Sequence, residues 1–145
     1  MRDLSRYLLI AGAVVFIVLS LAHAALTPQT TGEAKGLSPR DPATREAMAR
    51  DTLLLTHRTS LWLAWVGFNL SHSLGLVIFG VVTVLIGRSS ASFEAQARLF
   101  LPLAVLVCLS YVALGLLYWF RTPLAGILLA GLCFLASWVF FVRAG

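Results

Sequence analysis

Charged side chains are scarce in this sequence, and one long stretch of it has none. Asp, Glu, Lys and Arg make up 12% of the 145 residues, whereas hydrophobic residues make up 59%. The stretch from Leu61 to Gly87 contains no Asp, Glu, Lys or Arg, and it is longer than the roughly 20 residues that cross a bilayer as a helix. The mean hydropathy of the chain is +0.90. This composition argues against an ordinary soluble domain and predicts a polytopic membrane protein.

Cysteine is also rare, and catalytic sequence motifs are absent. Cys108 and Cys133 both lie inside apolar runs without CxxC spacing. A disulfide framework or a zinc knuckle is therefore not indicated, and each cysteine is interpreted as a small buried hydrophobic residue. The sequence has no HExxH, no GxSxG, no glycine-rich phosphate loop and no acidic pair within its apolar runs. An enzymatic function therefore has very little support.

Blocks of like charge are missing as well, although the formal net charge is +5. No basic patch alternates with aromatic residues, so nucleic acid is not an expected partner. Acidic lipid headgroups are the more natural counter-charge for arginines at the ends of membrane spans. The expected partners are therefore the lipid bilayer and, within it, other membrane subunits or further copies of this chain.

Four apolar segments are long enough to cross a bilayer, and they predict an all-α fold, an integral membrane four-helix bundle in a single domain. The expected spans cover residues 7–26, 61–87, 99–120 and 124–142. The first segment could instead be a secretory signal, because Ala22-His23-Ala24 matches a cleavage pattern after a basic start. Its apolar run exceeds the typical length of about 7–15 residues, which favours a helix that is retained.

The connection between the first and second spans, residues 27–60, is the one long polar segment. Ser38-Pro39 and Asp41-Pro42 each place a good N-cap residue before a proline at the first helical position. Residues 43–58 mix leucines with charged residues, which predicts an extramembrane amphipathic helix that lies on the membrane or caps the bundle and continues into the second span. A solvated connector without a binding role is the alternative. Residues 88–98 are expected to form a short polar turn.

The distribution of arginine orients the predicted topology. With the amino terminus in the cytoplasm, five arginines near span ends face the cytoplasm, namely Arg2, Arg6, Arg88, Arg98 and Arg143. Arg58 and Arg121 lie near the opposite face. Because basic residues close to the spans accumulate on the cytoplasmic side, the sequence predicts a multi-pass protein with both termini in the cytoplasm and the long loop outside.

Small residues are spaced for helix packing on two of the spans. Gly67, Ser71 and Gly75 recur every four residues on the second span, which predicts a ridge that lets another helix approach closely. Gly126 and Ala130 form a weaker version on the fourth span. A packing role explains both sets, and neither requires a functional interpretation.

Polar side chains interrupt the apolar character of the second span. Asn69, His72 and Ser73 are spaced so that they share one helix face. His23 lies one turn from the outer end of the first span, and the extra length of the second span can bring His72 to a similar depth. Because polar groups in hydrocarbon need partners, we expect these residues, with Tyr111 from the third span, to form a small polar chamber. This candidate ligand-binding site would open toward the outer face.

Several functions are compatible with this set of residues. Two facing imidazoles can ligate a haem iron, and a histidine with Asn and Ser partners can move protons or hold a polar group of a small ligand. No Asp, Glu or Cys at matching depth completes a metal site. Alternatively, the polar residues only fix helix packing in a structural or accessory subunit of a membrane complex. Hydrogen bonds across membrane helices contribute about 0.6 kcal/mol on average, so they would add specificity more than strength.

The stretch from Gly67 to Gly75, GFNLSHSLG, resembles the signature of an uncharacterised family of small bacterial four-helix integral membrane proteins. The spacing from His23 to Pro28 is also similar. The order of one span, an external helical loop and three closely spaced spans more loosely resembles the DoxX-like proteins. These resemblances imply a protein of the bacterial inner membrane. They imply no activity and no catalytic residue, since a shared fold does not carry function.

Overall fold

The computed structural model describes the whole chain from Met1 to Gly145, which divides into two compact units. The bundle unit comprises Met1–Leu19 and Leu76–Gly145, and the loop unit comprises Ser20–Gly75. Two of the long helices pass from one unit into the other, so each unit contains part of both.

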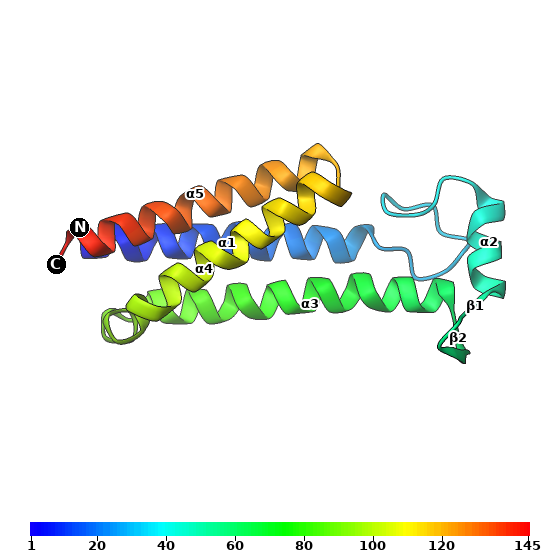
Figure 1. The fold of residues 1–145 in the computed structure, drawn as a ribbon, viewed down its shortest axis with the longest axis horizontal. Helices are drawn as coiled ribbons and strands as arrows, with labels where there is room; N and C mark the ends of the chain where they lie inside the picture. Colours follow the sequence, from blue (N-terminus) through cyan, green and yellow to red (C-terminus); the bar gives the residue numbers. More distant parts are fainter. The chain divides into compact units, whose positions relative to one another are not determined.

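Four helices are long and apolar enough to cross a membrane: α1 (Arg2–Leu26), α3 (Leu61–Arg88), α4 (Ser90–Tyr118) and α5 (Arg121–Arg143) (Figure 1). A short helix, α2 (Pro42–Arg50), and a two-stranded hairpin, β1 (Thr52–Leu53) and β2 (Thr56–Ser60), complete the secondary structure. The predicted all-α fold is confirmed. Long helices suit such apolar segments because a helix satisfies its backbone hydrogen bonds internally.

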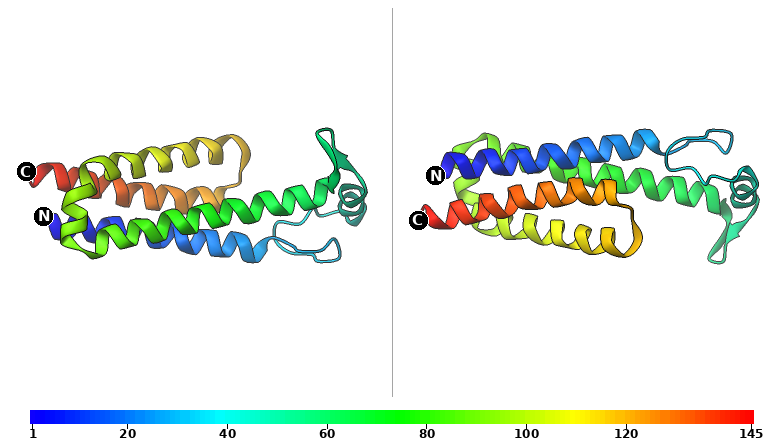
Figure 2. Two further views of the ribbon diagram at one scale, coloured as in Figure 1. Left: turned by 90° about the horizontal axis from the view of Figure 1, so that it is seen from below. Right: turned by 90° about the horizontal axis from the view of Figure 1, so that it is seen from above.

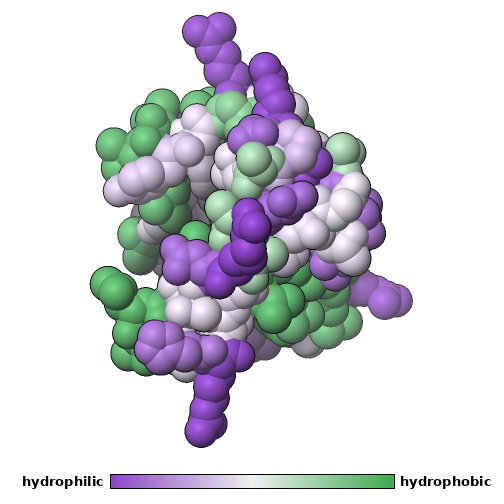
Figure 3. All heavy atoms as spheres, turned by 90° about the vertical axis from the view of Figure 1, so that its right-hand side faces the viewer, coloured by the Kyte–Doolittle hydropathy of each residue, from purple (hydrophilic) through white to green (hydrophobic).

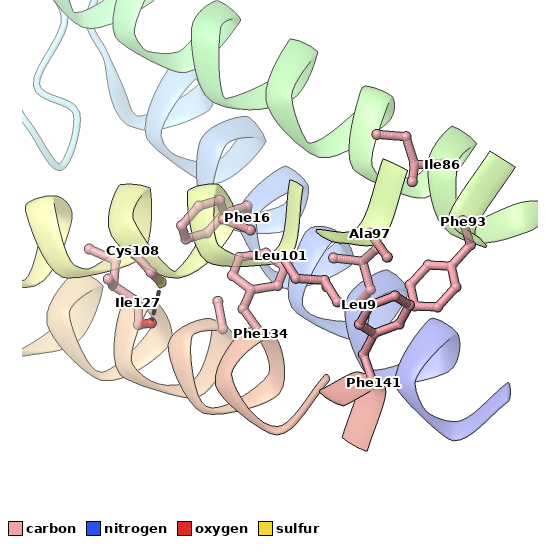
Figure 4. Packing of buried hydrophobic residues seen from close by; sticks show 12 residues of the cluster. Leu9, Phe16, Ile86, Phe93, Ala97, Leu101, Cys108, Ile127, Phe134 and Phe141 are labelled. Atoms are coloured by element: carbon pink, nitrogen blue, oxygen red, sulfur yellow. Dashed lines mark hydrogen bonds between the residues drawn. The ribbon is translucent and has the colours of Figure 1, made fainter. Parts of the chain in front are cut away.

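The bundle unit is a four-helix bundle with an aromatic centre. Phe16 of α1 packs edge-on against Phe134 of α5, with ring centroids 5.6 Å apart and ring planes at 84°. Leu101 of α4 is fully buried in the same core, and Figure 4 shows these side chains meeting between the helices. Near them, the Cys108 thiol donates a hydrogen bond to the Ile127 carbonyl at 3.3 Å. Cys108 is therefore a small buried residue, as the sequence predicts, whereas Cys133 is only half-buried.

Small residues allow α5 to approach α1 closely. A Cβ added at Gly126 would lie 2.7 Å from Cδ1 of Leu19, and one added at Gly12 would lie 3.1 Å from the carbonyl oxygen of Ala130. Ala130 itself is fully buried. The small-residue contact predicted for the fourth span is therefore present, with α1 as its partner.

Polar groups join the helices near the chain termini. Ser5 Oγ donates to the Ser137 carbonyl at 2.7 Å, and Ser137 Oγ donates to the Ser5 carbonyl at 2.7 Å. Arg6 donates from Nε to the Gly87 carbonyl at 3.1 Å and from Nη2 to the Arg88 carbonyl at 3.3 Å. The two ends of the chain therefore lie side by side at one end of the bundle unit, as both views in Figure 2 show.

The start of α4 differs from the expectation. Residues 88–98 do not form a polar turn, because the helix begins at Ser90. The side chain of Ser89 caps it by accepting a hydrogen bond from the Ser92 N–H at 3.3 Å. Phe93 and Ala97 then point into the core and are fully buried. The polar residues of this segment thus occupy the outer side of a helix whose inner side is apolar.

In the loop unit, α2 begins where predicted and ends early. The Asp41 carboxylate accepts hydrogen bonds from the N–H groups of Ala43 and Thr44 at 3.1 and 3.2 Å, and a proline follows it at the first helical position. The helix then ends at Arg50. The continuous helix expected over residues 43–58 and into the second span is therefore wrong.

A β-hairpin takes the place of the second half of that helix. Thr52 pairs with Ser60 and Leu53 with Thr56 in an antiparallel ladder with an irregular register. β-Branched threonines favour strands, which helps to explain why the helix is not continued. Leu54 and Leu55, expected on the apolar face of a helix, are instead fully exposed at the hairpin turn.

The loop before α2 is irregular and closed by side chains. Ser38, one of the two expected helix starts, instead donates from Oγ to the Glu33 carbonyl and accepts from the Lys35 N–H, both at 2.9 Å. The Glu33 carboxylate accepts from the Gln29 N–H at 3.0 Å and pairs with the Lys35 ammonium at 3.1 Å. The Gln29 N–H, and then Lys35, lower the pKa of the Glu33 carboxyl. Figure 3, which faces the loop unit, shows hydrophilic side chains projecting outward.

Candidate functional site

Three of the predicted site residues meet in the loop unit. His23 Nε2 lies 2.9 Å from Asn69 Oδ1, and the His23 and His72 rings are 5.1 Å apart between centroids, with planes at 58°. His23 comes from the last turns of α1, and the other two residues come from the first half of α3. The structure therefore brings together two residues from α3 and one from α1, as the sequence led us to expect.

Local structure positions each of these side chains. Asn69 and His72 are three residues apart, so they emerge from the same face of α3. His23 lies in the final turn of α1, where the Thr27 hydroxyl donates to its carbonyl at 2.9 Å and stays fully buried. Pro28 follows and cannot continue the helix. The end of α1 is thus anchored within one turn of the imidazole.

The hydrogen bonds of Asn69 assign the proton on His23. Asn69 Nδ2 donates to the Trp65 carbonyl at 2.8 Å, so its Oδ1 is the atom that faces His23. An amide oxygen only accepts, and the His23 Nε2 must therefore carry the hydrogen. Ser73 Oγ donates to the Asn69 carbonyl at 3.0 Å. The Trp65 carbonyl is the partner that the sequence did not single out, although its position four residues before Asn69 is a usual one for such a bond.

The cluster has a buried base, formed by Asn69 and Ser73, and a partly exposed rim, formed by the two imidazoles. Asn69 and Ser73 are buried, with 9% and 3% of their surface exposed, whereas both imidazoles are half-buried. The ring of Phe68 stacks near His72 with centroids 6.5 Å apart. A polar base under two partly accessible rings can hold a hydrogen-bonding group or take up a proton.

The remaining predicted member, Tyr111, belongs to the bundle unit. Its ring contacts Phe16 and Trp119 there, with centroids 6.1 Å away in each case. A role for Tyr111 beside the histidines stays a prediction.

Haem ligation does not fit this arrangement of the histidines. Axial ligation by two histidines needs a porphyrin between the rings and one nitrogen of each ring directed at the iron. Here the two rings contact each other directly, and Nε2 of His23 is directed at the Asn69 amide. Either histidine would have to leave its present partners to ligate iron.

The small-residue ridge predicted on the second span does not pack within this chain. Gly67, Ser71 and Gly75 are exposed, and a Cβ added at either glycine would meet no heavy atom within 4 Å. The close approach on α3 occurs further along, where a Cβ at Gly80 would lie 2.5 Å from Ile17 Cγ1. The expected rotation of the helix is therefore wrong. The face of α3 that carries Asn69 and Ser73 is buried, and the face that carries the small residues is exposed.

Compared with known proteins, the chain matches no family model, no curated protein and no solved structure.

Proposed function

We propose that this chain is a multi-pass protein of the bacterial inner membrane that binds a small hydrogen-bonding ligand at the His23–Asn69–His72 cluster. The observation that carries the proposal is the contact between two half-buried imidazoles above a buried amide. Ionisable residues inside a membrane segment are functional candidates because they are costly to keep there. The resemblance of the GFNLSHSLG stretch to small bacterial membrane proteins is consistent with this assignment.

The orientation that we propose places both termini in the cytoplasm. Arg6 bonds to the carbonyls of Gly87 and Arg88, and Arg2 lines a cavity with Arg98, so arginines from α1, α3 and α4 gather at one end of the bundle unit. A concentration of arginine at one membrane face favours the cytoplasmic side. The polar loop and the outer end of α1 would then face outward.

The chemistry of the cluster limits the class of ligand. A neutral imidazole offers one donor and one acceptor, and a protonated one offers two donors. His23 already uses its Nε2 hydrogen on Asn69. A carboxylate or hydroxyl group is therefore a better match than an apolar molecule, and a carboxylate would bind best when an imidazole is protonated.

A ligand screen on the purified chain in detergent tests this function. Thermal unfolding is followed with small carboxylic acids, amino acids and sugars, using the parent, His72→Phe and Ser71→Ala. Phenylalanine keeps a ring beside Phe68 and removes both nitrogens. Ser71 is exposed on the same helix and bonds only to the Phe68 carbonyl. We expect at least one compound to stabilise the parent and Ser71→Ala but not His72→Phe. A shift that persists in His72→Phe would contradict the site.

The second candidate function is a structural or accessory subunit whose polar cluster only joins α1 to α3. One observation favours it, because both ends of the Asn69 amide and the Ser73 hydroxyl already have partners within the chain. In that case Asn69→Leu would lower stability while no compound distinguishes the parent from His72→Phe.

A further inference from the structure

We propose that a cavity at the arginine-rich end of the bundle unit binds a phosphate group, most simply that of an anionic lipid. The cavity has a volume of about 230 Å³ and is lined by Arg2, Arg98, Trp138, Phe141, Val142 and Gly145. It combines two guanidinium groups with aromatic and aliphatic walls. This site is separate from the histidine cluster and does not depend on the function proposed for it.

Arg2 is held in place by contacts on two sides. Its guanidinium carbon lies 4.1 Å from the centroid of the Phe141 ring, and its Nη1 lies 3.4 Å from Glu94 Oε2. The Nη1 atom is buried and makes no hydrogen bond, so the contact with Glu94 is a coulombic one. A guanidinium that is already held on two sides loses less side-chain entropy when it binds an oxygen-rich anion.

Arg98 is the second guanidinium group at the cavity and has no ion-pair partner. It is exposed at the cavity, and none of the ion pairs or hydrogen bonds of the structure involves its guanidinium. Glu94 pairs with Arg2, so the Arg98 guanidinium keeps its donors available for an anion. Guanidinium groups bind phosphate through parallel hydrogen bonds, and basic pockets between membrane helices on the cytoplasmic side bind lipid headgroups.

The apolar walls favour a lipid over free phosphate. Trp138 and Phe141 lie in the last turns of α5, beside the start of α1 through the contact of Phe141 with Arg2. Tryptophan is enriched at the level of headgroups, where its ring meets both hydrocarbon and water. With the headgroup phosphate of a lipid at the two arginines, the glycerol and the upper part of an acyl chain of that lipid would lie against Trp138 and Val142.

Native mass spectrometry of the delipidated full chain tests the proposal. Phosphatidylglycerol and phosphatidylcholine are titrated separately, with inorganic phosphate as a third arm. We expect phosphatidylglycerol to bind more tightly than phosphatidylcholine, and Arg98→Gln to weaken it about fivefold. Arg143→Gln is the matched control, since it removes the same charge from the same end of the unit without lining the cavity. Equal loss in the two variants, or equal binding of the two lipids, would overturn the site.

Glu94→Gln separates a binding site from a structural ion pair. If the cavity binds phosphate, removing the nearby carboxylate should strengthen the binding of phosphatidylglycerol, because a like charge is lost. Weaker or unchanged binding in Glu94→Gln would count against the proposal. Binding of inorganic phosphate with the same loss in Arg98→Gln would uphold the phosphate site and assign it to free phosphate. Each variant is compared at matched thermal stability, so that misfolding is not mistaken for lost binding.

Discussion

The Nε2 hydrogen of His23 is donated to Oδ1 of Asn69 at 2.9 Å, across 46 positions of sequence. This bond joins the end of α1 to the first half of α3 within the loop unit. The bond also determines which ring nitrogen of His23 carries the hydrogen, because the Asn69 amide is oriented by the Trp65 carbonyl. A ligand that accepts the Nε2 hydrogen of His23 must therefore compete with an existing hydrogen bond.

Replacing Asn69 by leucine should destabilise the loop unit. The substitution keeps the side-chain size and leaves the His23 N–H without its acceptor. We expect a loss of roughly 0.6–1.7 kcal/mol, between the average and the largest value measured for hydrogen bonds across membrane helices. Reversible unfolding in mixed micelles measures the change. Ser71→Ala, on the exposed face, should unfold like the parent. An unchanged Asn69→Leu would mean that the bond adds nothing to stability.

Two glycines of α3 should respond oppositely to alanine. A Cβ at Gly80 would lie 2.5 Å from Ile17 Cγ1 and 3.1 Å from the Ala13 carbonyl, whereas one at Gly75 meets nothing. Gly80→Ala should therefore cost about 1–3 kcal/mol through overpacking. Gly75→Ala should be neutral or stabilise by up to about 1 kcal/mol through helix propensity. Thermal unfolding of the two variants side by side gives the comparison, and equal destabilisation would place Gly75 in a contact.

The capping of α2 should weaken in acid. The N–H of Ala43, then the Thr44 hydroxyl, lower the pKa of the Asp41 carboxyl below its usual value of 3.8. Because the folded pKa is the lower one, this contribution is present above the usual pKa and is lost as the pH falls through the folded pKa. The protection of the α2 amides against hydrogen exchange, relative to an unfolded chain at the same pH, should therefore fall below about pH 4. Asp41→Asn keeps a capping oxygen and should remove that dependence. The same acid response in both proteins would exclude Asp41 as its cause.

Single cysteines should report the orientation. A cysteine at Ala43, in α2, is expected to react with an impermeant reagent added outside the inner membrane. A cysteine at Ser90, at the start of α4, should react only after the membrane is opened. The expectation follows from the arginines that gather at one end of the bundle unit, because arginines near span ends favour the cytoplasmic side. Of the native cysteines, Cys108 is buried and Cys133 is half-buried in α5, so the parent protein measures the background. Labelling in the reverse order would invert the topology.

Local properties of the sequence determined the membrane helices and the helix cap. Hydropathy is a property of each segment by itself, so four apolar segments predict four long helices without knowledge of their neighbours. The Asp41 cap is local too, since its partners lie two and three residues away. Where short-range signals compete, the prediction failed. Threonines at 52 and 56 gave a hairpin, and Ser89 started a helix in a segment that looked like a turn.

The tertiary structure decided which face of each helix turns inward. α3 is apolar on nearly every side, and the four-residue spacing of Gly67, Ser71 and Gly75 singled out a packing surface that did not include Gly80. Only the contact with Ile17 identifies Gly80 as the point of close approach. Likewise, the sequence named His23 and Asn69 as candidates, but the bond between them requires two helices to meet. In a membrane, no hydrophobic driving force distinguishes one face of an apolar helix from another. Packing and polar contacts with neighbouring helices therefore determine which face is buried.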